Sequence, residues 1–185
     1  MMKLNKLIGS TTAKVAAMAI AFGCAFGAWA DTVAKIVETG AEYDSVTAAV
    51  TAASDGQTVQ LSNLAILTEN MVVGDNKAIT LDLNGNTIYT ASNPNDPSTL
   101  HNIQIHTGAS LTISNPDGSY GGGIINQAAQ DAVIVVKGTL IVNIGTAYEN
   151  CKIENQSTGN TVQVNSTGRV IVNKGGITAE TGNAV

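Results

Sequence analysis

The sequence has few aromatic and few charged residues. Of its 185 residues, 4% are Phe, Trp or Tyr and 12% are charged, and Arg169 is the single arginine. A packed α/β enzyme domain normally holds more of both kinds, so the core must come from β-branched aliphatic residues on short strands. The formal net charge is −5, and this acidic excess disfavours nucleic acid and anionic membrane surfaces as partners.

Cysteine and histidine are equally scarce, with two residues of each. Zinc sites and nucleophilic thiol sites need several such side chains together, and neither a histidine nor a second cysteine accompanies Cys151. Cys151 alternates in phase with Ile153, so we expect it to point inward as a small hydrophobic residue. The sequence predicts no metal site and no cofactor.

The first thirty residues have the composition of a secretory signal peptide. A basic leader precedes an alanine-rich run at Val15–Ala28, and Ala28-Trp29-Ala30 has the small-x-small form that signal peptidase cuts. We expect cleavage after Ala30 and export to the cell surface, the medium or the periplasm. About 14 apolar residues fall short of the roughly 20 that span a bilayer. Lipoprotein processing at Cys24 is the alternative, although Phe22 fits a lipobox poorly.

Three glycines spaced thirty residues apart, Gly108, Gly138 and Gly168, each separate two short apolar strings of alternating pattern. The strings are Ile103–Ile105 with Leu111–Ile113, Val133–Val135 with Leu140–Val142, and Val162–Val164 with Val170–Val172. A two-residue period predicts strands, so each unit is expected to be strand, glycine turn and strand. A further string begins at Ile125, Ile153 and Ile177.

Such repeats predict an all-β parallel β-helix of about 23 to 30 residues per coil, spanning residues 58–185. One coil cannot bury its inward side chains alone, so successive coils must stack, with equivalent strands paired in parallel about 4.8 Å apart. The open C-terminal end of such a stack carries unpaired strand edges. The sequence therefore predicts a tendency to self-associate.

The alternation also predicts which side chains point outward. In the first string these are Gln104, Ile134 and Gln163, and in the second they are Asp82, Thr112, Ile141 and Ile171. By the same alternation Val135 points inward. Neither outward set stacks carboxylates, so a multi-oxygen Ca²⁺ site is not expected. The outward isoleucines either lie under an insertion loop or mark a contact surface.

An asparagine follows the second string of each unit. These asparagines are Asn84, Asn115, Asn143 and Asn173. Short amides tolerate left-handed backbone and can hydrogen-bond to the amides above and below them. We therefore expect them, like the three spaced glycines, to be structural turn residues that form a ladder.

Residues 31–57 differ from the repeats and are expected to cap the first coil. Ala34–Val37 is typical of a short strand, and the next segment is typical of one short amphipathic helix. Its apolar face is formed by Val46, Ala49, Val50 and Ala53. Asp44 or Ser45 can cap its start and Gly56 can end it.

The segments Ala52–Leu61 and Ala78–Ile88 resemble the N-terminal cap and first coil of pectin-lyase-like right-handed β-helix proteins. The phrases at Ala109–Ile113 and Val172–Ile177 resemble the repeats of large bacterial surface and adhesin-like proteins with that fold. The resemblance covers residues 31–185 and implies right-handed coils. It also implies an exported structural or adhesive repeat segment, because this scaffold carries inert stalks as well as lyases and hydrolases.

The alternative function is the N-terminal part of a polysaccharide lyase or glycoside hydrolase. The chain has no Asp-Asp pair, and its remaining candidates for acid, base or proton abstraction fall at different phases of the coils. They are His101, His106, Asp117, Asp131, Glu154 and Arg169. The sequence therefore predicts no catalytic residue in this chain. Because Thr181–Val185 repeats the pattern of Thr158–Val162, we expect a longer protein, whose later coils would carry any catalysis.

Insertion loops on a rigid scaffold are the usual place for recognition. The candidate ligand-contact residues in and beside these loops are Tyr89, Asn93, Asn95, Asp96, Tyr120 and Tyr148. Tyrosines beside amides can stack on sugar rings, so the expected partner is a polysaccharide or a cell-surface glycan. The alternative is that these are ordinary loop residues that cover the scaffold.

Overall fold

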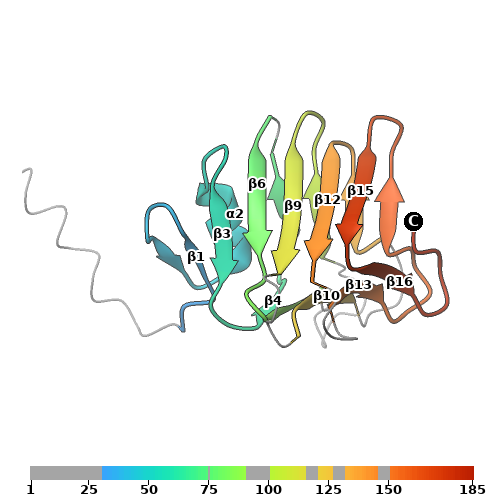
Figure 1. Ribbon diagram of the computed structural model, residues 1–185, viewed down its shortest axis with the longest axis horizontal. Coiled ribbons are helices and arrows are strands. Elements are labelled where there is room, and N and C mark those ends of the chain that lie inside the picture. Colours follow the sequence, from blue (N-terminus) through green and yellow to red (C-terminus); the bar gives the residue numbers. More distant parts are fainter. Residues whose placement is uncertain (1–30, 75, 91–100, 116–120, 127–131, 146–150) are drawn as a thin grey trace, which may run out of the picture. The chain divides into compact units, whose positions relative to one another are not determined.

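The computed structural model describes residues 31–74, 76–90, 101–115, 121–126, 132–145 and 151–185. Residues Thr32–Val185 form one compact unit, and the expected signal peptide at residues 1–30 lies outside the described residues. In the described part the chain is mostly β-strand with one short helix (Figure 1). The predicted predominance of β-strand is thus confirmed.

The described strands belong to three sheets, which we name A, B and C. Sheet A holds β1 (Ala34–Ile36), β2 (Glu42–Tyr43), β3 (Thr58–Leu61), β6 (Ala78–Asp82), β9 (Ser110–Asn115), β12 (Thr139–Ile144) and β15 (Arg169–Lys174). Sheet B holds β4 (Ala65–Ile66), β7 (Thr87–Tyr89), β10 (Gly123–Asn126), β13 (Lys152–Asn155) and β16 (Gly176–Ala179). Sheet C holds β5 (Met71–Val73), β8 (Ile103–Ile105), β11 (Ile134–Val136) and β14 (Val162–Val164).

From β3 onward the chain visits the three sheets in rotation. Sheet A therefore runs β3, β6, β9, β12, β15, with every third strand of the chain as a neighbour (Figure 1). The pairings between these strands are parallel, whereas β1 pairs antiparallel with both β2 and β3. Among the described strands each sheet is open, with two different edge strands.

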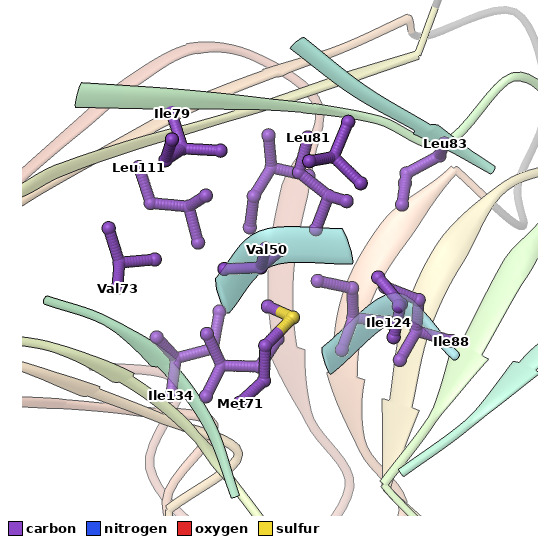
Figure 2. Close-up of a cluster of buried hydrophobic side chains, with 14 of the residues drawn as sticks. Val50, Met71, Val73, Ile79, Leu81, Leu83, Ile88, Leu111, Ile124 and Ile134 are labelled. Atoms are coloured by element: carbon purple, nitrogen blue, oxygen red, sulfur yellow. The ribbon is translucent and has the colours of Figure 1, made fainter. Parts of the chain in front are cut away.

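The core lies between the three sheets and is aliphatic. Ile79, Leu81 and Leu111 of sheet A face Met71 and Ile134 of sheet C and Ile88 and Ile124 of sheet B (Figure 2). Each of these side chains is at most 2% exposed. Burying a side chain of this size stabilises a fold by about 1.5–3 kcal/mol. These aliphatic side chains therefore provide the stabilisation that the scarce aromatic residues cannot.

The helix α2 (Val46–Ala52) begins where the sequence predicts it. The Oγ of Ser45 accepts a hydrogen bond from the backbone N–H of Ala48 at 3.1 Å, as an N-cap does. Its buried face includes Val46, Ala49 and Val50, and it packs against β1, β2, β3 and β5. The helix ends at Ala52 because Ala53 is already extended, so the expected end at Gly56 is wrong.

The predicted register is wrong by one residue in two strings. Ile124, and not Ile125, pairs with Ile153, and the string at 133–136 is shifted in the same way. Ile134 pairs with Ile103 and Val162 and is fully buried, whereas Val135 pairs with Gln104 and Gln163 on the outside. The sequence expectation had Ile134 outward and Val135 inward. Residues 133–136 are four β-branched residues in a row, with no polar residue among them. The phase of a two-residue period therefore cannot be located within this run.

The second outward set is also corrected. Thr112 pairs with Thr80 and Ile141, and Ile141 pairs with Ile171, so these residues form one outward column. Asp82 pairs instead with Ser114, two residues further along the strand. A shift of two residues preserves the face of the sheet, so Asp82 still lies outside.

The expected asparagine ladder does not form at the predicted positions. Asn143 pairs with Ser114 and Lys174, whereas Asn115 pairs with Ile144. Asn84 has a positive φ of 47° in the turn after β6, but Asn143 and Asn173 lie inside strands rather than in turns. Asn84, Asn115 and Asn143 lie three, two and one residues after the aligned Leu81, Ile113 and Val142, so they do not share a register position.

The three spaced glycines lie between strands of sheets C and A, and two of them are required by close approach. A Cβ on Gly138 would overlap the carbonyl oxygens of Ala109 and His106, and one on Gly168 would overlap that of Val136. Gly108 has a φ of +78°, which favours glycine for conformational reasons.

Candidate functional site

The outer face of sheet B carries the one described residue of the predicted ligand-contact set. Tyr89 lies in β7 and is partly exposed. The other five candidates, Asn93, Asn95, Asp96, Tyr120 and Tyr148, lie outside the described residues. The candidate site is therefore the surface around Tyr89.

Tyr89 is part of a row of side chains that crosses sheet B. It pairs with Ile66 of β4 on one side and with Ile125 of β10 on the other. Glu154 of β13 and then Thr178 of β16 continue the row. Neighbouring strands lie about 4.8 Å apart. Ile66, Tyr89 and Ile125 form an apolar and aromatic half of the row, and Glu154 and Thr178 form the polar half beside it.

The polar half is organised around the carboxylate of Glu154. Its Oε1 lies 2.7 Å from the Nζ of Lys152, which is on the same face because side chains two residues apart share a face. Its Oε2 accepts a hydrogen bond from the Nε2 of Gln156 at 2.8 Å. Both carboxylate oxygens are thus held in place, one by a residue of β13 and one by the residue that follows β13.

These contacts determine the ionisation of Glu154. Partial burial raises its pKa, but the hydrogen bonds from Lys152 and Gln156 and the charge of Lys152 outweigh that effect, and the pKa is lowered from the ordinary 4.5. Glu154 is therefore a carboxylate at neutral pH. A fixed carboxylate beside an ammonium group and an amide suits hydrogen bonding to hydroxyls better than proton donation.

The other candidates for chemistry are spread over the fold. His101 precedes β8 and His106 follows it, both partly exposed, and Arg169 begins β15 on the exposed side. Asp117 and Asp131 lie outside the described residues. Within the described part of the chain, no three His, Cys, Asp or Glu side chains gather as metal ligands would.

Cys151 points inward, as predicted. It is 5% exposed, and its Sγ donates to the carbonyl oxygen of Gly121 at 3.2 Å. The Nδ2 of Asn115 lies 3.6 Å from the same sulfur. The thiol is thus part of the packing between β9, β10 and β13.

One polar feature was not predicted from the sequence. Thr90, Asn126 and Asn155 are buried at the end of sheet B where the chain leaves for sheet C. Asn126 and Asn155 occupy the same register position on neighbouring strands. The strings that hold Ile124 and Ile153 each end in an asparagine, but this shared position appears only when Ile124, and not Ile125, is aligned with Ile153.

Comparisons with protein-family models, with curated proteins and with solved structures find no match for this chain. In the described residues, no helix has the length and apolar character that crossing a membrane requires.

Proposed function

We propose that this chain is an exported, structural or adhesive segment of a bacterial surface protein, built as a right-handed parallel β-helix of the pectin-lyase-like type. The observation that supports it most is the rotation of the strands through three sheets. From β3 to β16, each strand pairs in parallel with the strand three places later. Stacked coils produce this order, because equivalent strands of successive coils become neighbours.

A structural role follows from the energetics of such a stack. Each coil buries its inward Ile, Leu and Val against the coils on either side, so stability increases with each interface added. The hydrogen bonds between coils run along the stack, which makes it stiff. A stiff scaffold of this kind needs no reactive side chains to act as a stalk or spacer.

The adhesive part of the proposal rests on the outer face of sheet B. The ring of Tyr89 and the side chain of Ile125 offer an apolar surface to the face of a sugar ring. Lys152, Glu154 and Gln156 offer donors and acceptors to its hydroxyls. The ligand class is therefore a polysaccharide or cell-surface glycan that lies across the strands.

Export is tested by expressing the whole chain in a bacterial host and sequencing the N-terminus of the mature protein. We expect a new N-terminus at Asp31 in the periplasm or medium, and no processing when Ala28 and Ala30 are both changed to Arg. A protein that retains Met1 in the cytoplasm would overturn export. A lipid on Cys24 would replace this cleavage site with lipoprotein processing.

Glycan binding is tested with a glycan array followed by calorimetry on any oligosaccharide retained. Removing one stacking ring typically costs about 1 kcal/mol or more, so Tyr89→Ala should weaken binding roughly fivefold or more. Gln163→Ala is the matched control, because Gln163 is exposed on the outer face of sheet C. Retained binding in Tyr89→Ala would exclude this face as the site.

A further inference from the structure

Sheet B carries very little charge. Among the described residues of its five strands, Lys152 is the one basic residue and Glu154 the one acidic residue. Both lie in β13, on the outer face that includes Tyr89. The nearest basic residue along the chain, Lys174, belongs to β15 of sheet A, where it pairs with Asn143. An anionic ligand on the sheet B face therefore depends on Lys152 for a counter-charge.

The charge of Lys152 is already compensated within its own strand. Its Nζ lies 2.7 Å from the Oε1 of Glu154, and the two side chains are 29% and 15% exposed. The neighbours of Lys152 on both sides are glycines, because Gly176 pairs with it and Gly123 stands beside it, one residue before the paired Ile124. Neither glycine has a side chain that could draw the ammonium group away from Glu154. A ligand carboxylate reaches Lys152 only by displacing a carboxylate that is already in place.

The positions beside this ion pair add negative charge. The N–H of Gln156 donates to the carbonyl oxygen of Asn126 at 2.9 Å, and the N–H of Glu180 donates to that of Asn155 at 2.9 Å. Gln156 and Glu180 thus occupy equivalent places after β13 and β16, and Glu180 is exposed. By sequence, the connections into and out of β7, β10 and β13 add four acidic residues and no lysine or arginine: Asp96, Asp117, Asp131 and Glu149. The formal charge on and beside these strands is therefore negative.

The hydrogen-bonding groups of the polar half suit hydroxyls. The Oε1 of Glu154 contacts Lys152 and its Oε2 accepts from Gln156 at 2.8 Å, and each carboxylate oxygen has two lone pairs. A further partner of either oxygen must bring a proton, as a sugar hydroxyl does and an ionised sugar carboxylate does not. A uronate on this face places its own negative charge close to Glu154, because neighbouring strands lie about 4.8 Å apart. Like charges juxtaposed in an interface strongly disfavour binding.

We propose that the outer face of sheet B binds a neutral glycan, a chain of pyranose rings without acidic groups, and excludes polymers of uronic acids. The rings stack on Tyr89 and Ile125 through their apolar faces, and their hydroxyls donate to Glu154. This ligand class rests on the proposed adhesive function, which it narrows. Selection against acidic sugars then depends on the charge of Glu154, which can be removed without removing the stacking surface.

The first test is a glycan array probed with the processed full chain. The array holds neutral gluco-, manno- and galacto-oligosaccharides beside oligogalacturonate and oligomannuronate. We expect the chain to bind neutral members only. Equal or stronger binding to the uronates would overturn the neutral ligand class and leave the adhesive function standing, whereas an array without any bound chain would overturn both.

The second test is calorimetry with a matched pair of ligands: a neutral oligosaccharide that the array identifies, and the same oligosaccharide oxidised at C6 from hydroxymethyl to carboxylate. The oxidised form should bind at least about tenfold more weakly. Glu154→Gln should close most of this gap, because it removes the repulsion and leaves Lys152 to pair with the ligand. Glu42→Gln is the matched control, since it changes the net charge equally but lies in β2 of sheet A. A gap that persists in Glu154→Gln would contradict the proposal.

The salt dependence of binding keeps the proposal testable if circular dichroism shows that Glu154→Gln fails to fold. Raising the salt concentration from about 0.01 M to about 1 M shortens the Debye length from about 30 Å to about 3 Å. For the natural chain, binding of the oxidised oligosaccharide should strengthen with salt, because the repulsion is screened, and binding of the neutral one should stay constant. Binding of the oxidised form that weakens with salt would reveal attraction by a cation, and the proposal would be wrong.

Discussion

The Nδ2 of Asn126 donates a hydrogen bond to the Oδ1 of Asn155 over 3.2 Å, from β10 to β13 inside the core. The Nδ2 of Asn155 donates in turn to the carbonyl oxygen of Asn160 at 3.2 Å, and its Oδ1 also accepts from the N–H of Ser157 at 3.0 Å. Both asparagines are at most 2% exposed. This pair joins two strands of sheet B and fixes the corner at which the chain turns toward β14.

Asn155→Ala is expected to lower the free energy of unfolding by about 1–3 kcal/mol, because it leaves buried donors and acceptors without partners. Urea denaturation followed by circular dichroism measures the loss. Gln163→Ala is the control, since Gln163 is exposed and its hydrogen bond to Asn165 is long, at 3.5 Å. Equal losses in the two variants would mean that the buried amide pair contributes nothing specific.

The corrected register of β11 gives a second prediction. Ile134→Asp should destabilise the protein by at least about 4 kcal/mol, because it places a carboxylate without a partner in an aliphatic core. Val135→Asp should cost less than about 1 kcal/mol, since a surface position tolerates charge. Thermal melts of the two variants compare neighbouring residues of one strand. A larger loss for Val135→Asp would restore the register that the sequence pattern suggested.

The sequence predicted the strands best where apolar and polar residues alternate strictly. Leu111-Thr112-Ile113 is such a case, and its inward and outward positions agree with β9. The run at 133–136 contains only Val and Ile, so the phase of its alternation could not be determined. The two-residue strand β4 is too short for any period to be visible, and its place at the edge of sheet B depends on pairing with distant Tyr89.

The candidate site was predicted less completely than the fold. Tyr89 was selected as an aromatic residue beside an insertion loop, but its neighbours Ile66 and Ile125 come from strands 23 residues before it and 36 residues after it. The number of residues between them and Tyr89 depends on the lengths of the turns, which differ from repeat to repeat. The sequence offers Glu154 as a candidate acid or base. Its contact with Lys152 depends on the two-residue period of β13, and that period is visible in the sequence.

Gly138 gives a third prediction, about close approach rather than backbone freedom. The carbonyl oxygens that a Cβ would meet are fixed: that of Ala109 accepts from Thr139 at 2.9 Å, and that of His106 accepts from Ala109 at 3.0 Å. Gly138→Ala should therefore destabilise the protein by about 1–3 kcal/mol, as overpacking does. Gly74→Ala is the matched control, because nothing lies within 4 Å of its added Cβ. A melt of Gly138→Ala as high as that of the control would show that the turn between β11 and β12 can move away from the turn between β8 and β9.

The final prediction concerns acid stability and Glu154. Its pKa in the folded protein is below the ordinary 4.5, because the hydrogen bonds and charge of Lys152 and the amide of Gln156 outweigh partial burial. The folded state therefore binds this proton less readily than the unfolded state does. The stabilisation is fully present above the ordinary pKa and is lost as the pH falls through the lowered one.

The expected size of this effect is at most about 1 kcal/mol, since solvent and salt screen a partly exposed ion pair. Lys152→Met should raise the pKa of Glu154, measured by carbon-13 NMR of the carboxyl group, and should shift the loss of stability to higher pH. Glu154→Gln should remove this part of the pH dependence altogether. A Glu154 titration that is unchanged in Lys152→Met would contradict the pairing, and with it the fixed carboxylate on which the polar half of the sheet B face depends.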